Sequence, residues 1–422
     1  MNRKTFLQQS AIIASGHLLI PHVLQAKRKK NAVILVVSGW QDVNIGDIAH
    51  TPGLLNILQT FVPSATIILW KRKKGQEAER MLEKDFPKVK IIYGNVDNDK
   101  NVDAKEVVDA FKESDILIHG SGSGVVGKAN IEAWMKYSNK PFGIFGASIL
   151  SVNESLKPLL MKASFIYTRE TDSLKILREG GISGKPMSFA PDATFYMHIH
   201  NKAKAVNFLK ENNLEERKFI CAIPRLRVTP YYQFNPNNAG WSDEKIKQVN
   251  ELNEKKKEPD HAKLREAMIT WVRETGNKVL VCPEMTYQLD IMDELLIDPL
   301  PEDLKPYVIK RGYWLPDEAA SVYAKAHTVL SFECHSPIIA AVNNTPFFYL
   351  RQPEDTIKGQ MYYDLGFSDW VFEIEQTEGK QIADRLREVR QNYSQSKNRI
   401  ATAMKRIEGI YARGTDFIKK II

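Results

Sequence analysis

The sequence predicts an α/β fold of parallel strands and helices, and two observations lead to this prediction. Short, continuous apolar segments such as 32–39 and 115–119 have the length and composition of strands that are buried on both faces. Segments with helical periodicity, such as 54–58 and 103–113, alternate with them along the chain. Because the chain has 422 residues and the alternation fills most of it, we expect two domains rather than one large core.

The first half of the chain alternates regularly between the two kinds of segment. We expect strands at 32–39, 66–70, 90–93, 115–119, 141–146 and 165–168. We expect helices around 54–58 and at 75–85, 103–113, 156–162 and 169–179. A glycine-rich loop, 120–124, follows the fourth strand, where it either brings backbone amides close to a phosphate or forms a tight turn. Residues 189–194 end this domain.

The second half repeats the pattern after a charged, helical stretch at 201–217. We expect strands at 219–224, 278–282, 307–311, 328–332, 347–350 and 370–374. We expect helices at 261–274, 290–296 and 316–326, one that opens near His335, and one at 355–364. A polar, aromatic-bearing insertion at 228–259, which includes a Lys/Glu-rich helix, is interpreted as a lid or acceptor-binding loop, or as a surface excursion without a role.

These elements divide the chain into four segments. Residues 1–30 are expected to be a targeting segment, 31–200 an N-terminal α/β domain and 201–375 a second α/β domain. Residues 376–422 are strongly charged and are expected to form C-terminal helices.

The composition excludes several classes of function. The net charge of +8 is modest for this length, and its basic runs at 27–30 and 71–74 are typical of a processing flank and a solvated loop, so we expect no nucleic-acid partner. A mild positive bias suits anionic substrates. The three cysteines are widely spaced, without the pattern of a zinc site or a disulfide framework, and we therefore expect no metal.

The N-terminus resembles a bacterial twin-arginine export signal. Arg3 and Lys4 precede Phe6 and Leu7, and an apolar run at 11–20 follows. This predicts export, with the periplasm as destination. The alternative is an amphipathic helix on a cytoplasmic protein. The run is too short to span a bilayer, and no other stretch is apolar enough, so we expect no stable transmembrane span.

The segment 328–350 contains the strongest single candidate for a functional residue. A short apolar strand ends in polar residues, and a helix then opens near His335. In a parallel sheet these residues lie at the carboxyl edge, where ligands bind. An imidazole at a helix N-terminus can exchange a proton near neutral pH, and the adjacent amides favour an anion. The alternative is a histidine that only caps or packs the helix.

Several strand-end motifs together resemble the polysaccharide pyruvyl transferase family. The matching segments are 44–47, 115–124, 140–143, 167–174, 190–192 and the pair 335–336. Their order spans roughly 33–375. The resemblance implies two Rossmann-like domains that face each other across a cleft, as in glycosyltransferases of the B type. It also implies that the long C-terminal helical region packs back across both domains.

The resemblance further implies transfer of a pyruvyl group from phosphoenolpyruvate to a sugar hydroxyl of a cell-surface glycan. The glycan and phosphoenolpyruvate would be the partners, with phosphoenolpyruvate acting as donor substrate and no cofactor. The donor's phosphate and carboxylate require cationic groups. Its methylene carbon must gain a proton and the acceptor hydroxyl must lose one, which requires a general acid and base.

On this resemblance His335 is the acid/base candidate, and its neighbour Ser336 belongs to the same motif. Arg225 and Arg227 are the leading candidates for binding the donor's anionic groups, and Arg169 is a third. The alternative for these arginines is ion pairing without a catalytic role. The acceptor half of the cleft would be lined by Asn44, Asp47, Ser121 and Gly122, although Asp47 could instead cap its helix.

The chain departs from the family at Glu333, where members usually carry an arginine that helps to bind the donor anion. A carboxylate there repels phosphate at close range. Export raises the same difficulty, because phosphoenolpyruvate is expected to be cytoplasmic. Glu333 is therefore a second catalytic candidate, as a carboxyl partner of His335 in acid-base chemistry on a sugar.

Two alternatives to pyruvyl transfer stay open. One is an exported, divergent relative that binds or processes an acidic polysaccharide without phosphoenolpyruvate. The other is a glycosyltransferase that uses a nucleotide sugar, in which Glu284 or Glu333 would bind the ribose.

Overall fold

The computed structural model describes residues 31–72, 74–234 and 240–422. The proposed export signal at 1–30 lies outside this range. Residues 32–422 form one compact unit, and it is this unit that is described below. Within the described residues, no helix is long and apolar enough to cross a membrane.

The first half contains a sheet of seven parallel strands in the order β3-β2-β1-β4-β5-β6-β7. The strands are β1 (Val33–Val37), β2 (Thr66–Lys71), β3 (Lys90–Tyr93), β4 (Ile116–His119), β5 (Phe142–Ala147), β6 (Phe165–Thr168) and β7 (Met187–Phe189). The helices are α2 (Ile45–Phe61), α3 (Gln76–Asp85), α4 (Lys105–Glu113), α5 (Lys128–Tyr137), α6 (Lys157–Lys162) and α7 (Thr171–Glu179), followed by the 3₁₀ turn η1 (Ala193–Tyr196). Of these, α5 and β7 were not predicted.

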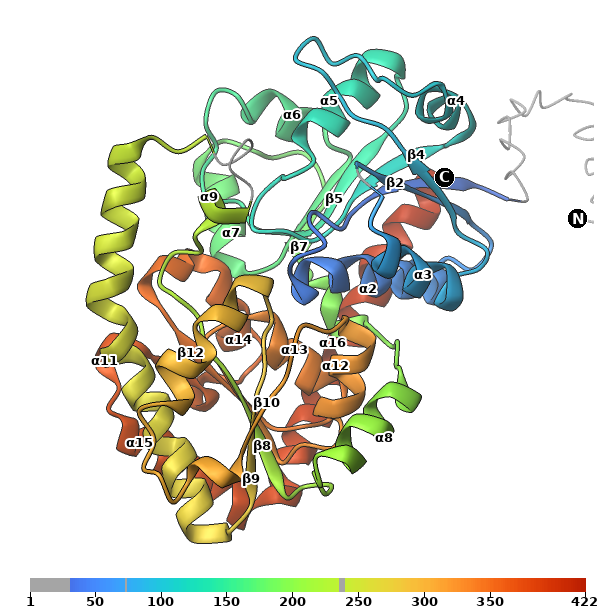
Figure 1. The fold of residues 1–422 in the computed structure, drawn as a ribbon. Helices are drawn as coiled ribbons and strands as arrows, with labels where there is room; N and C mark the ends of the chain where they lie inside the picture. Colours follow the sequence, from blue (N-terminus) through green and yellow to red (C-terminus); the bar gives the residue numbers. More distant parts are fainter. Residues whose placement is uncertain (1–30, 73, 235–239) are drawn as a thin grey trace, which may run out of the picture. The chain divides into compact units, whose positions relative to one another are not determined.

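Both faces of this sheet are covered, as its continuous apolar strands require. In β1, Leu35 and Val37 pack in a buried cluster with residues of α4, α5 and α6. Ile34 and Val36 point to the opposite face, into a cluster with residues of α2 and α3 that continues into the second half of the chain. Figure 1 shows these two groups of helices on either side of the sheet.

The second half contains six parallel strands in the order β10-β9-β8-β11-β12-β13. The strands are β8 (Phe219–Ile223), β9 (Lys278–Val281), β10 (Val308–Lys310), β11 (Thr328–Ser331), β12 (Phe347–Arg351) and β13 (Val371–Glu373). The α-helices are α8 (Lys202–Glu211), α9 (Tyr231–Phe234), α11 (Asp243–Thr275), α12 (Pro316–Tyr323), α13 (His335–Val342) and α14 (Gln360–Asp364). The predicted α/β class is confirmed.

Short helical turns occupy several connections of the second half. They are the 3₁₀ turns η2 (Thr286–Asp290), η4 (Lys305–Tyr307), η5 (Pro353–Gly359), η6 (Ser368–Trp370) and η7 (Ile374–Gln376), and the π-helical turn η3 (Asp293–Ile297). The helices predicted at 290–296 and 355–364 are therefore replaced by such turns, with α14 completing the second of them.

Helix α11 corrects the prediction for the insertion. The prediction had a Lys/Glu-rich helix inside the insertion, which ends at Pro259, and a separate helix from His261, but the structure has one helix that starts at Asp243 and continues through that proline. It begins at an N-cap, since Ser242 accepts a hydrogen bond from the amide of Lys245, and it ends at Gly276 in the left-handed conformation.

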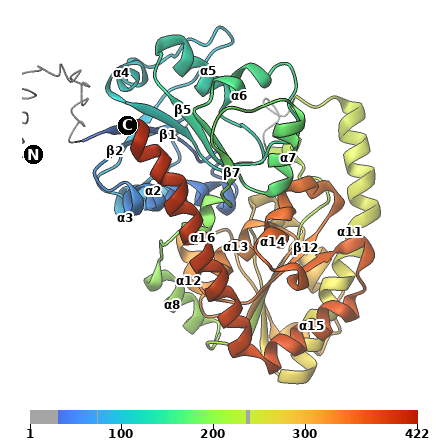
Figure 2. The ribbon, with the colours of Figure 1, turned by 180° about the vertical axis from the view of Figure 1, so that it is seen from behind.

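The C-terminal region forms two helices, α15 (Gly379–Gln391) and α16 (Tyr393–Ile421). Helix α15 packs on α11, whereas α16 contacts α2 and η1 in the first half and α13 in the second. Figure 2 shows α16 running past both sheets. Its Tyr411 hydroxyl donates to the carbonyl of Asp192 (2.7 Å), and its Arg399 donates to the carbonyl of Gly366.

A candidate active site at the junction of the two sheets

The carboxyl ends of the two sheets meet through their backbones. The loop between β1 and α2 pairs with the loop after β9, so that Asn44 and Met285 form an antiparallel bridge. The amide of Ile45 donates to the carbonyl of Glu284 (2.9 Å), and the amide of Thr286 donates to the carbonyl of Val43 (3.0 Å). In the first sheet the loop after β1 leaves a strand next to the point where the strand order reverses, which is where α/β proteins bind ligands. In the second sheet this point lies between β8 and β11, and the loop after β9 is one strand away from it.

Helix α2 begins inside this junction. Asn44 caps it, because its side-chain oxygen accepts hydrogen bonds from the amides of Gly46 (2.7 Å) and Asp47 (3.4 Å). Gly46 leaves the space into which the ring of His335 fits, since a Cβ atom at that position would overlap the imidazole. One turn after Gly46, His50 lies on the same face of the helix.

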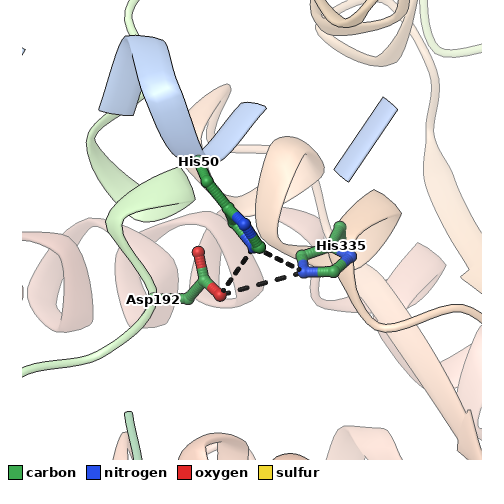
Figure 3. Close-up of side chains that lie close together, drawn as sticks. All are labelled: His50, Asp192 and His335. Carbon is green, nitrogen blue, oxygen red and sulfur yellow. Dashed lines mark hydrogen bonds and ion pairs between the residues drawn. The ribbon is translucent and has the colours of Figure 1, made fainter. Parts of the chain in front are cut away.

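His50, Asp192 and His335 converge at the centre of the junction (Figure 3). The two Nε2 atoms lie 3.1 Å apart. The Oδ2 atom of Asp192 is 3.2 Å from Nε2 of His50 and 3.8 Å from Nε2 of His335. All three side chains are buried, and they come from α2, from the N-cap position of η1 and from the first residue of α13.

Glu284 fixes the orientation of His335. The Nδ1 atom of His335 lies 3.0 Å from Oε1 of Glu284, so the imidazole donates its Nδ1–H there. The other carboxylate oxygen accepts from the backbone amide and the hydroxyl of Ser336, at 2.6 and 2.8 Å. Both oxygens of Glu284 are thus bound by residues at the start of α13. Neither oxygen is left to bind a ribose, the alternative role considered for Glu284.

The side chain of Arg169 lies behind the cluster of His50, Asp192 and His335 and is shielded from solvent. Its guanidinium donates to Oδ2 of Asp192 (3.1 Å) and to the hydroxyl of Ser148 (2.8 Å), and it lies 3.6 Å from Glu170. The side chain is buried, and these contacts favour the alternative that it is a structural ion-pair partner. Its effect on the site is to hold the carboxylate of Asp192 in place.

The surroundings of His335 stabilise positive charge. Burial favours the neutral imidazole, but the Cys334 sulfur and the carboxylates of Asp192 and Glu284 raise the pKa of His335 well above its usual value. Burial likewise opposes charge on Asp192, yet His50 and His335 hold the pKa of that carboxyl well below its ordinary range. Against the same effect of burial, His335 and Ser336 lower the pKa of Glu284.

Glu333, the departure from the family pattern, is paired rather than free. Its Oε1 accepts a hydrogen bond from Gln288 (2.8 Å), and its Oε2 lies 3.4 Å from Nε of Arg225. Burial raises the pKa of Glu333 to about 7, although Arg225 opposes the shift. Family members usually carry an arginine at the position of Glu333. Here Arg225, which follows β8, brings its guanidinium to the same place.

Arg225 is part of a buried charge cluster that includes a lysine not predicted from the sequence. Its Nη1 donates to Asp355 and to Gln352, and Lys358 pairs with the same Asp355 at 2.7 Å. The Nε–H group of Arg225 makes no hydrogen bond within the described ranges.

Arg227 takes a different direction from Arg225. It pairs with Asp260, with Glu354 (3.1 Å) and with Glu375 (3.3 Å). These contacts fix the start of the insertion to α11 and to the loop after β12. These partners are all away from His335, so the structure does not bring the predicted pair of arginines together at the histidine.

Ser121 and Gly122 support the junction from behind. The hydroxyl of Ser121 accepts a hydrogen bond from the amide of Ala193 (2.9 Å), next to Asp192, and the carbonyl of Gly122 accepts from the amide of Ser148 (3.0 Å). The carbonyl of Ser121 also accepts from the indole of Trp40 (2.6 Å). Both residues therefore shape the loops that carry Asp192 and Ser148.

The insertion reaches the first half of the chain through Tyr231. Its hydroxyl accepts a hydrogen bond from Gln41 (3.3 Å), and Gln41 also donates to Asp47. Asp47 in turn lies 4.0 Å from Nδ1 of His50. This arrangement fits the interpretation of the insertion as a segment that covers the junction, and it places Asp47 beside the cluster rather than in the N-cap of α2.

Comparison with solved structures finds chains that share this arrangement over nearly their whole length. A putative UDP-N-acetylglucosamine 2-epimerase from Listeria monocytogenes matches with a TM-score of 0.58 at 13% identity, covering 92% of this chain and 97% of that one. A glycosyltransferase from Rickettsia africae matches with a TM-score of 0.59 at 13% identity, covering 93% and 98%. The Anabaena protein HepE in complex with UDP-glucose matches with a TM-score of 0.58 at 12% identity, covering 91% and 99%.

At these identities the likeness concerns the fold, and it confirms the predicted glycosyltransferase-B-like arrangement. Comparison with curated proteins finds no match. The sequence profile described as "Polysaccharide pyruvyl transferase" matches residues 44–352, from the N-cap of α2 to the end of β12. This match includes His50, Asp192 and His335, and it covers well over half of the chain. The chain therefore belongs to the polysaccharide pyruvyl transferase family.

Proposed function

We propose that this protein is a transferase that moves a pyruvyl group from phosphoenolpyruvate to a sugar hydroxyl of a cell-surface glycan. One observation carries the proposal. His335, at the position of the family histidine, lies buried at the meeting point of the two sheets, between a carboxylate of the first half, Asp192, and one of the second half, Glu284. This histidine would be the acid/base group of the transfer.

Arg225 and Lys358 are the groups that we assign to the donor. Phosphoenolpyruvate carries a phosphate and a carboxylate, which bind best to charged donors with free N–H groups. The Nε–H of Arg225 makes no hydrogen bond within the described residues, although it lies 3.4 Å from Glu333, and Lys358 adds a second cation at the shared carboxylate of Asp355. The carboxylate of Glu333 already pairs with Arg225 and accepts a hydrogen bond from Gln288. These contacts lessen the repulsion between Glu333 and the anionic donor that its place in the sequence led us to expect.

The test measures phosphate release from phosphoenolpyruvate by the full-length protein, with and without oligosaccharides that carry neighbouring free hydroxyls. We expect release that depends on the oligosaccharide and is lost in His335→Ala. Arg225→Ala should raise KM for phosphoenolpyruvate by about tenfold or more, because a hydrogen bond from a charged donor is lost. Arg273→Ala is the matched control, since Arg273 pairs with Asp303 in an exposed position.

Titration calorimetry with phosphoenolpyruvate and with UDP separates the alternatives without knowledge of the acceptor. Binding of phosphoenolpyruvate that weakens in Arg225→Ala supports the proposal. Binding of UDP in its place would favour transfer from a nucleotide sugar, the chemistry suggested by the UDP-bound structural neighbour. Binding of neither would contradict pyruvyl transfer and favour a relative that only processes an acidic polysaccharide.

A further inference from the structure

Three potential metal ligands face one another at the junction. They are Nε2 of His50, Nε2 of His335 and Oδ2 of Asp192, and they lie within 4.8 Å of one another. The Nδ1–H of His335 is used by Glu284, so its Nε2 carries the lone pair when the imidazole is neutral. Two imidazole nitrogens 3.1 Å apart beside a carboxylate oxygen need a positive group among them, and either a bound proton or a metal ion can supply it.

The separations match the coordination distances of zinc. A cation equidistant from three atoms that are 3.1, 3.2 and 3.8 Å apart lies about 2.0 Å from each of them. Zinc binds imidazole nitrogen at about 2.0–2.1 Å and carboxylate oxygen at about 2.0–2.2 Å. A set of two histidines and one carboxylate leaves a fourth position for water or substrate.

The groups around the three ligands orient them as second-layer partners of a metal do. Glu284 accepts the Nδ1–H of His335, which fixes the tautomer and the ring plane. Arg169 donates to Asp192 and Thr194 donates to its other oxygen, so this carboxylate cannot rotate freely. The Nδ1 atom of His50 makes no hydrogen bond in the described part of the chain, and Asp47 at 4.0 Å is the carboxylate closest to serving it.

The local charges also suit a cation. The buried carboxyl groups at this place are Asp192, Glu284 and Glu170, and the only guanidinium in contact with them within the described residues is that of Arg169. The guanidinium shares Oδ2 of Asp192, which weakens that oxygen as a ligand. The two imidazoles carry the larger part of the binding, and imidazole favours zinc and its neighbours over magnesium or calcium.

We propose that His50, Asp192 and His335 bind one divalent transition-metal cation, with zinc as the best match. This goes against the expectation of a metal-free site drawn from the sequence. The inference modifies the proposed function in one respect: with Nε2 of His335 bound, the ion rather than the imidazole would act on the acceptor hydroxyl at this site. The binding itself does not depend on pyruvyl transfer.

The test measures metal content and affinity in the purified, full-length protein. After chelation and dialysis, titration with zinc chloride should saturate at one ion per chain and raise the melting temperature. Magnesium and calcium chloride should do neither. Replacement of the ligand in His50→Ala and in His335→Ala should abolish this binding, and Glu284→Gln should weaken it about 10- to 100-fold. His198→Ala, an exposed histidine, is the control.

The metal-free melting temperature of each variant shows whether a loss of zinc binding is a loss of fold. Zinc that binds wild type and His50→Ala equally would overturn the inference, and so would wild-type protein that takes up no zinc while folded. Since neither phosphoenolpyruvate nor a glycan enters these measurements, a negative result here leaves the transfer assay as a separate question. Zinc binding without phosphoenolpyruvate binding would support the metal site and contradict the proposed donor.

Discussion

At the scale of single residues, the shape of the junction depends on Gly46 as much as on the charged groups. The ring of His335 occupies the volume in which a side chain at Gly46 would begin. Gly46 has negative φ and lies in the first turn of α2, so glycine is required there by the close approach of His335 and not by the backbone conformation.

Replacing Gly46 by alanine should therefore destabilise the protein, although alanine is the better helix former. We expect a loss of about 1–3 kcal/mol from overpacking, against a gain of up to about 1 kcal/mol in helix propensity. Urea unfolding followed by circular dichroism measures the difference. Gly124→Ala is the control, because nothing lies within 4 Å of a Cβ atom there, and it should change stability by less than about 0.5 kcal/mol. A stabilised Gly46→Ala variant would show that His335 is not held against this turn.

The sequence identified His335, Glu333 and Arg225 because each follows a strand directly. It missed His50, which lies within a helix, although the spacing of Gly46 and His50 puts them on one face and gave a usable signal. The sequence could not show that Arg225 and Arg227 have different partners. Their partners are carboxylates more than thirty residues away, such as Asp355 and Asp260, and only the folded chain decides which arginine pairs with Glu333.

At the scale of elements, helix α16 supports the site from outside both sheets. The hydroxyl of Tyr411 is buried and donates to the carbonyl of Asp192 (2.7 Å), with Pro191 at 3.3 Å. This contact ties the last helix of the chain to the backbone of a residue in the central cluster.

Tyr411→Phe should cost about 0.5–1.5 kcal/mol, because it removes one buried hydrogen bond without changing the ring packing. Denaturant midpoints of the wild type and the variant give this value. Tyr137→Phe is the matched control, since Tyr137 is 42% exposed, and its midpoint should stay unchanged. An unchanged midpoint for Tyr411→Phe would mean that the Tyr411 hydroxyl does not help to hold α16 in place.

The strands were predicted more accurately than the helices, because buried parallel strands are short and continuous in their apolar character. Strands β2, β3 and β6 agree with the prediction within one residue. The prediction divided α11 at Pro259, because proline removes a helical hydrogen bond and usually ends a helix. Here Val249 and Asn253 are buried before the proline and Leu264 after it, so packing on both sides keeps the helix continuous.

At the scale of the whole molecule, three buried histidines make the fold sensitive to acid. Burial lowers the pKa of His119 to about 3, and those of His261 and His327 to about 4. In the unfolded chain they take up protons below about pH 6.5. The unfolded state then binds more protons than the folded state, so stability is lost as the pH falls from about 6.5 towards 4.

The melting temperature should therefore drop steadily between pH 6.5 and pH 4, by an amount equivalent to about 2–3 kcal/mol for each histidine. His327→Gln removes one of the three groups and should make the drop shallower, which scanning calorimetry at a series of pH values detects. Equal slopes for the two proteins would mean that His327 is protonated in the folded state.

The pairing of residues 43–45 with 284–286 joins the two sheets by main-chain atoms alone. The donors are the amides of Ile45 and Thr286, so exchanging either side chain for another leaves the bonds in place, and proline is the substitution that removes a donor. Coupling of this kind leaves no trace in covariation between side chains. Hydrogen exchange does detect it, because these two amides exchange with solvent when the pairing opens, and their exchange rates record how often the two sheets separate at this point.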